Sequence, residues 1–167
     1  MTRLSLSGAL ALALFATGCS TTTVTMVDDM PDPAPTPGDM AMVSECVDGA
    51  ASAEGSTFEC SNVDLVAYVP LEAFDADQLN DIWGWTDSET GKEYAIVGLA
   101  NGTEFIDISN PTNPILLGKL PTQTVSTVWR DIKVYQDHAF IVSEARDHGM
   151  QVFDLTRLRG LTSDQGE

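Results

Sequence analysis

Short runs of apolar residues, separated by polar turns, dominate the chain from about residue 76 onward. Tyr94–Leu99 and Ala139–Glu144 are nearly continuous in apolar side chains at their centres, which is typical of strands covered on both faces. The same region is rich in Val, Ile, Phe, Trp and Tyr and lacks long stretches with helical periodicity. The pattern therefore predicts an all-β fold.

These runs belong to a pattern that the chain contains twice. Three elements recur at offsets of 50, 45 and 47 residues, so length differences fall between the elements. The pairs are Asp81–Trp83 with Asp131–Lys133, Tyr94–Leu99 with Ala139–Glu144, and Gly102–Ser109 with Gly149–Thr156. Ile115–Leu120 adds a fourth strand to the first copy, and repeats of this length are typical of propeller blades. We expect β-propeller-like tandem four-stranded blades over residues 76–167, with the second copy incomplete and the chain part of a longer protein.

Each copy carries an aspartate at the end of its third element, Asp107 in the first and Asp154 in the second. Because side chains alternate along a strand, Asp107 shares a face with Phe105, and Ile106 lies on the other face. An aspartate at a strand end can accept backbone N–H bonds from the following turn. We interpret the repeated aspartate as a structural latch in preference to a catalytic group.

The N-terminal residues have the composition of an export signal. Arg3 precedes the apolar run Leu10–Phe15, which is too short to span a bilayer, and small residues follow. Ala16-Thr17-Gly18-Cys19 resembles the lipobox of bacterial lipoproteins, with Ala16 where leucine is usual. We expect residues 1–18 to be a lipoprotein signal peptide and Cys19 to be lipidated. The alternative is an ordinary signal peptide with a chance cysteine.

The residue after the cysteine and the segment that follows indicate a location. In lipoprotein signals an aspartate after the cysteine marks inner-membrane retention, and Ser20 lacks that mark. The resemblance therefore implies an outer-membrane anchor, facing the periplasm or the cell surface. Residues 19–42 are rich in Pro, Thr and Asp, which predicts an extended tether.

Cys46 and Cys60 are the two other cysteines of the chain. In an exported protein an isolated pair is most simply a disulfide, because the compartment is oxidising. Two thiolates are too few for a metal site, and neither histidine is close in sequence. We expect a disulfide-stapled segment over residues 43–75.

The formal net charge of −17 disfavours a nucleic-acid partner, because an acidic surface repels phosphates. Solubility of an exported protein explains the charge more simply than a cation-binding surface does. We predict neither a metal nor a cofactor.

Candidate chemistry is sparse. His138 and His148 lie near predicted turns, and Asp147-His148-Gly149 is the best of the weak polar candidates, although ordinary turn residues explain it as well. Trp83, Trp85 and Trp129 can line a cleft, but repeated tryptophans more often pack in a core. No catalytic residue is assigned.

Longer stretches resemble the choice-of-anchor B family. They are Asn80–Asp87, Thr90–Ala95, Trp129–Tyr135 and His148–Leu155, and Glu104–Ile108 and Gln151–Leu155 echo that family's LVIVD-type repeats. The resemblance implies an exported, β-propeller-like protein, anchored differently in different members, and brings no catalytic residues. It favours a cell-envelope lipoprotein that binds a protein or glycan ligand or acts as a scaffold. The alternative is a propeller hydrolase or lyase whose active site lies mostly beyond the given residues.

Overall fold

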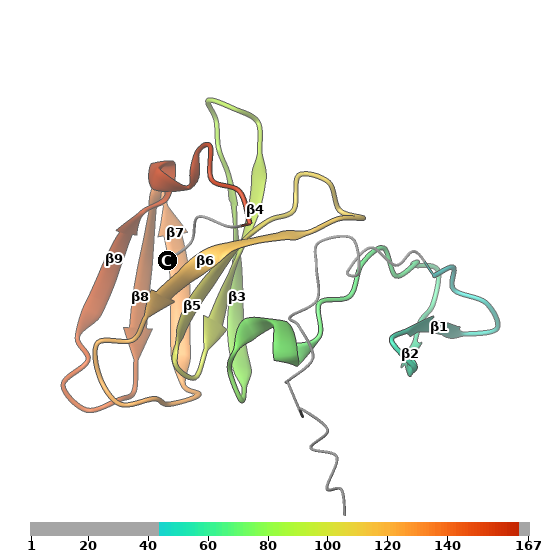
Figure 1. Cartoon of the computed structure of the whole chain (residues 1–167), viewed down its shortest axis with the longest axis horizontal. Coiled ribbons are helices and arrows are strands. Elements are labelled where there is room, and N and C mark those ends of the chain that lie inside the picture. The colour runs from blue at the N-terminus through green and yellow to red at the C-terminus, as the bar shows by residue number, and fades with distance from the viewer. Residues whose placement is uncertain (1–43, 164–167) are drawn as a thin grey trace, which may run out of the picture. The chain divides into compact units, whose positions relative to one another are not determined.

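The structure is a computed structural model that describes residues 44–163. Its elements are β1 (Ala50–Ala53), β2 (Ser56–Glu59), the 3-10 helix η1 (Leu71–Phe74), β3 (Leu79–Thr86), β4 (Glu93–Leu99), β5 (Gly102–Asp107), β6 (Ile115–Pro121), β7 (Arg130–Tyr135), β8 (His138–Ser143), β9 (Met150–Asp154) and the 3-10 helix η2 (Leu155–Leu158) (Figure 1). All strand pairs are antiparallel. The predicted all-β fold is confirmed. Within the described range, no helix is long and apolar enough to cross a bilayer.

The two copies of the sequence pattern form two separate sheets. Strands β3–β4–β5–β6 make a four-stranded sheet, here called the first blade. Strands β7–β8–β9 make a three-stranded sheet, here called the second blade. The strands of each blade follow one another in chain order, so each sheet is a simple meander, as expected for incomplete propeller-like blades.

One aspartate joins the two sheets. Asp81 lies in β3, and one of its carboxylate oxygens accepts the backbone N–H of Ile132 in β7 at 2.7 Å. The other oxygen accepts the N–H of Ile82 at 2.9 Å. Asn80, one residue earlier, donates its side-chain amide to the carbonyl of Arg130 at 3.1 Å. The first strands of the two blades are therefore linked by side-chain bonds although they belong to different sheets.

The register of the strands corrects one part of the sequence alignment. Trp85 pairs with Tyr94 across β3 and β4, and Tyr135 pairs with His138 across β7 and β8. His138 is therefore the counterpart of Tyr94, and the offset of the second element is 44 residues. The predicted offset of 45 was wrong by one residue. The offsets of the first and third elements agree with the pairing.

With this register, each blade has two distinct faces. We call the face turned toward the preceding part of the chain the rear face, and the face turned toward the following part of the chain the forward face. The rear face of the first blade carries Ala95, Val97, Leu99 and Ile106, and that of the second carries Ala139, Ile141 and Phe153. The forward face of the first blade carries Trp85, Tyr94, Ile96 and Phe105, and that of the second carries Tyr135, His138, Phe140 and Val152. The forward face of the first blade packs against the rear face of the second in one hydrophobic cluster. Phe105 and Phe153 stack there with their ring centroids 4.4 Å apart.

The rear face of the first blade is covered by the segment that precedes it. Phe74, which ends η1, is 4 % exposed and packs with Ala95, Val97, Leu99 and Ile106. Val69 and Ala76 pack against the same cluster. Both faces of the central strands β4 and β5 are therefore buried, which explains their near-continuous apolar sequence.

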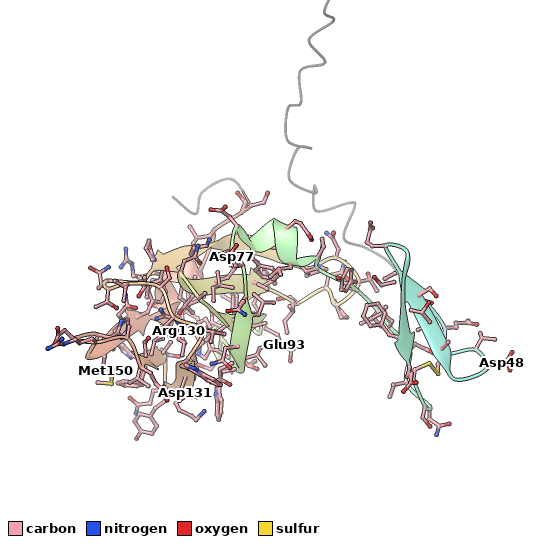
Figure 2. All side chains as sticks on the ribbon, turned by 90° about the horizontal axis from the view of Figure 1, so that it is seen from below. Asp48, Asp77, Glu93, Arg130, Asp131 and Met150 are labelled. Atoms are coloured by element: carbon pink, nitrogen blue, oxygen red, sulfur yellow. A yellow bond between two sulfur atoms is a disulfide. The ribbon has the colours of Figure 1, made fainter. Side chains whose placement is uncertain are left out.

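Cys46 and Cys60 form the predicted disulfide, with their Cα atoms 5.9 Å apart. The intervening residues form the β1–β2 hairpin, in which Ala51 and Ala53 are buried. Figure 2 shows the yellow disulfide bond beside this hairpin. The predicted signal peptide (1–18), Cys19 and the tether (19–42) lie outside the described residues.

Two glycines of the first blade allow a matched test of its packing. A Cβ at Gly102 would lie 2.6 Å from the backbone oxygen of Leu120 in β6, whereas one at Gly98 would meet its nearest atoms at 3.4 Å. We expect Gly102→Ala to lower the free energy of unfolding by about 1–3 kcal/mol, because the clash with backbone forces β5 and β6 apart. Gly98→Ala should change it by less than about 1 kcal/mol. Urea unfolding of both variants measures the difference, and equal effects would contradict the β5–β6 geometry.

Candidate functional site

The interface between the two blades changes character along its length. Its middle is the apolar cluster of Ile132, Ile141, Phe105 and their neighbours. At the end where β4, β6 and β8 finish and β5, β7 and β9 begin, it is lined by polar side chains, and this is the lower end of the sheets in Figure 1. We call this set the Arg130 cluster: Thr103, Thr122, Thr124, Arg130, His148 and Gln151.

Arg130 is the first residue of β7 and is 1 % exposed. Figure 2 shows it within the packed side chains of the two blades, whereas Met150 lies at the periphery. Because strand side chains alternate, Arg130 shares the rear face of the second blade with Ile132 and points back toward the first blade. Its Nε donates to the carbonyl of Leu99 at 3.0 Å.

The rest of the Arg130 guanidinium has no partner among the described residues. Nη1 and Nη2 are both buried and make no hydrogen bond. No carboxylate of this part of the chain forms an ion pair with it. Desolvation therefore lowers the pKa of Arg130, with no anion to offset it. The group remains a cation, because even a lowered arginine pKa stays far above neutrality.

His148 lies beside Arg130 in the connection between β8 and β9 and is 9 % exposed. Its Nδ1 is 3.0 Å from the hydroxyl of Thr124. Its Nε2 is buried and has no hydrogen-bond partner. Desolvation, and then the charge of Arg130, lowers the pKa of His148. The ring is therefore neutral at pH 7, and when Thr124 donates to Nδ1 the proton sits on Nε2.

Three further side chains of the cluster hold buried oxygens without partners. They are the hydroxyls of Thr103 and Thr122 and the amide oxygen of Gln151. Gln151 is held in place because its Nε2 donates to the carbonyl of Pro121 at 3.0 Å. Thr122 is fixed through its backbone, whose N–H donates to the carbonyl of Asn101 at 3.0 Å. Buried polar groups in folded proteins are normally paired. This number of unpaired groups at one place therefore indicates a missing partner.

The sequence found part of this site. His148 belongs to it, but Asp147 is exposed and pairs with Arg146 at 3.7 Å. His138 lies at the opposite end of β8 from His148, so the two histidines do not come together. Arg130 was missed. The available signal was the alternation of Arg130, Ile132 and Val134, which places an arginine on an otherwise apolar face.

The other residues that the sequence singled out lie elsewhere. Asp107 accepts the N–H of Ser109 at 2.9 Å, and Asp154 accepts that of Thr156 at 3.0 Å, so both bind the turn that follows. Asp107 also pairs with Lys92 at 2.7 Å. Among the tryptophans, Trp85 stacks on Tyr94, Trp83 lies under Lys133, and Trp129 is exposed.

The end of the interface opposite the Arg130 cluster is ionic. Arg159, which follows η2, donates to both carboxylate oxygens of Asp87 at 2.7 and 2.8 Å. It also donates to Glu89. Asp87 is fully buried by its neighbours, and the hydrogen bonds from Arg159 hold the pKa of its carboxyl well below the usual range. This arginine has its counter-ion, in contrast to Arg130.

A shallow surface hollow lies near the same end as the Arg130 cluster, lined by Glu72, Asp75, Asp77 and Asn101 among others. Within residues 44–163, no group of three His, Cys, Asp or Glu side chains is arranged to hold a metal ion.

One comparison with known proteins identifies the repeat. Residues 91–122 match the LVIVD repeat. The match covers β4, β5 and β6, including the Glu104–Ile108 stretch that suggested it, and it supports a β-propeller-like repeat architecture. No curated protein and no solved structure matches the chain.

Glu104 in β5 gives a pH-dependent prediction. Its side chain is 4 % exposed, and one oxygen accepts the N–H of Gly118 at 3.1 Å. Desolvation raises the pKa of Glu104 from 4.5 to about 7. The folded protein therefore holds a proton that the unfolded chain loses, so stability falls as the pH rises from about 4.5 to about 7 and the penalty persists above that range.

We expect Glu104→Gln to raise the free energy of unfolding by about 3 kcal/mol at pH 8 and to leave it nearly unchanged at pH 4.5, because one pKa unit corresponds to about 1.4 kcal/mol. The glutamine keeps an oxygen that can accept from Gly118. Urea unfolding at the two pH values tests this, with the exposed Glu93→Gln in β4 as the control. An equal effect of Glu104→Gln at both pH values would show that charge burial is not the cause.

Proposed function

We propose that the protein is a cell-envelope lipoprotein of the choice-of-anchor B kind, in which a β-propeller-like domain binds a ligand or acts as a scaffold. The export signal and lipobox-like sequence around Cys19 support the anchor. The LVIVD repeat and the resemblance to that family support the domain type. The role is non-catalytic, and its partners are a membrane, through the lipid, and a protein or glycan.

The observation that carries the proposed repeat domain is that the second blade has the same apolar kind of forward face as the first blade. On the first blade, the forward-face residues Trp85, Ile96 and Phe105 are 6, 0 and 3 % exposed because the second blade covers them. On the second blade, the matching Tyr135 and Val152 are 69 and 52 % exposed.

Asp131 repeats the same arrangement in the strand that links blades. It is the counterpart of Asp81, whose carboxylate holds the next blade through Ile132, and it is exposed. The second blade thus presents both the apolar surface and the acceptor with which the first blade binds its successor. We propose that a further LVIVD-type blade covers this face, in a protein longer than the 167 residues given.

This face has a direct test. Left uncovered, an apolar sheet face promotes association, so the 167-residue chain should self-associate in sedimentation experiments at micromolar concentration. Val152→Glu should shift it toward monomer, whereas Val125→Glu, at a residue that is 72 % exposed outside this face, should not. A gene product that continues beyond Glu167 should be a compact monomer. A monomeric 167-residue chain with a sharp two-state melt would overturn the proposal of a further blade.

The anchor is tested in cells that process bacterial lipoproteins. The mature protein should begin at an acylated Cys19 and partition into detergent, and Cys19→Ser should abolish this because the acyl chains supply the membrane affinity. Ser20→Asp is the matched control: it should keep the acylation and move the protein to the inner membrane. An unmodified N-terminus beyond Cys19, found by mass spectrometry, would contradict the proposed anchor.

A further inference from the structure

We propose that the Arg130 cluster is a binding site for a small oxyanion, a carboxylate or a phosphate, held between the two blades. The inference goes beyond the proposed function, because it depends neither on the lipid anchor nor on further blades. It rests on three features of the cluster: an unpaired buried cation, a set of hydrogen-bond donors around it, and the contribution of both blades.

The first feature is the charge of Arg130. Burying a cation without a counter-ion is costly, and proteins normally pair such a group. The side chain is 1 % exposed, and only Nε has a partner, the carbonyl of Leu99. Arg159, at the other end of the same interface, shows what this fold does with an arginine that has an anion available: it binds Asp87 through two nitrogens. Arg130 has the same fork of donors and no carboxylate within the described residues to receive it.

The second feature is the character of the neighbouring groups. Nη1 and Nη2 of Arg130 are donors only, and the hydroxyls of Thr103 and Thr122 can donate as well. His148 adds Nε2, which is a donor whenever Thr124 donates to Nδ1. The unpaired oxygen of Gln151 is an acceptor, which suits a water or a hydroxyl group carried by the ligand. A planar arginine fork, with hydroxyl and imidazole donors at the same end of the interface, matches the oxygens of a carboxylate or a phosphate.

The third feature is the position of the site. Thr103 and Thr122 belong to the first blade and to the segment that leaves it, whereas Arg130, His148 and Gln151 belong to the second. An anion bound by both sets would hold the blades together at the end where the apolar cluster stops. Binding should therefore stabilise the folded protein in proportion to ligand occupancy.

The experiment measures thermal unfolding of the full chain in increasing sodium acetate or inorganic phosphate, with sodium chloride at matched ionic strength as the reference. We expect acetate, phosphate or both to raise the melting temperature saturably above the chloride reference. Stabilisation by acetate alone identifies a carboxylate site, and stabilisation by phosphate alone identifies a phosphate site.

Arg130→Met should abolish the anion-dependent rise in melting temperature, because it keeps most of the apolar stem of the side chain and removes the guanidinium fork. Arg146→Met, at an exposed arginine of the β8–β9 connection, should keep that rise in full. His148→Gln retains Arg130 and should weaken the apparent affinity by about 2–10-fold, the value of one hydrogen bond. The shift of the Arg130 Nε–H resonance on titration of the unmodified chain gives a readout that needs no variant.

The proposal is overturned if neither anion exceeds chloride, or if Arg130→Met responds as the unmodified chain does. Should Arg130→Met fail to fold, the resonance titration and His148→Gln decide the matter. An unshifted Arg130 resonance, or an unchanged affinity in His148→Gln, then counts against the site.

Discussion

The arrangement of the two blades depends on the carboxylate of Asp81. Its two oxygens accept backbone N–H groups from β3 and from β7, strands that belong to different sheets. Lys133 is 3.9 Å from one of these oxygens and lies over the ring of Trp83 at 4.1 Å. A backbone donor that would otherwise be unpaired at the edge of β7 is thereby satisfied by a side chain. The hydrophobic contact between the blades gives the association its energy, and this bond sets how they align.

The interface that results contains two arginines in opposite states. Arg159 is paired with Asp87 and Glu89, and Arg130 is buried without an anion. Between them lies an apolar cluster that includes Ile132, Ile141 and Leu155, each of them fully buried. The middle of the interface is apolar and buried. A change at either end therefore affects the contact between the two blades as a whole. This is why a ligand at the Arg130 cluster would alter stability as well as local structure.

The fold followed from the sequence more completely than the site did. The strands were predictable because turn residues bound each apolar run, and the Asp81 and Asp131 motifs fix the start of each copy. The alignment of the second element failed by one residue because both faces of β4 are buried, so its apolar sequence does not mark which side chain points which way. Tyr94 and His138 also differ in chemistry, which hid their equivalence. Only the pairing with Trp85 and Tyr135 reveals it.

The Arg130 cluster could not be predicted in the same way. Its members come from β5, β7 and β9 and from two connections, and they meet only because one sheet packs on the other. The sequence alone shows that Arg130 interrupts an apolar face. Whether a carboxylate lies near Arg130 depends on how the two sheets pack together. His148 was noted for its residue type, while the burial that makes its ring neutral depends on tertiary contacts.

The covering of the first blade by Phe74 has a consequence for the order of events during synthesis. The segment around η1 precedes the first blade in the chain and packs on its rear face, while the second blade packs on the forward face. The cover of each rear face is therefore supplied by residues that have already left the ribosome, and the cover of each forward face is supplied by the blade made next. Folding can advance from the N-terminus in step with translation, one sheet at a time, and at any moment only the newest forward face is exposed to unwanted association.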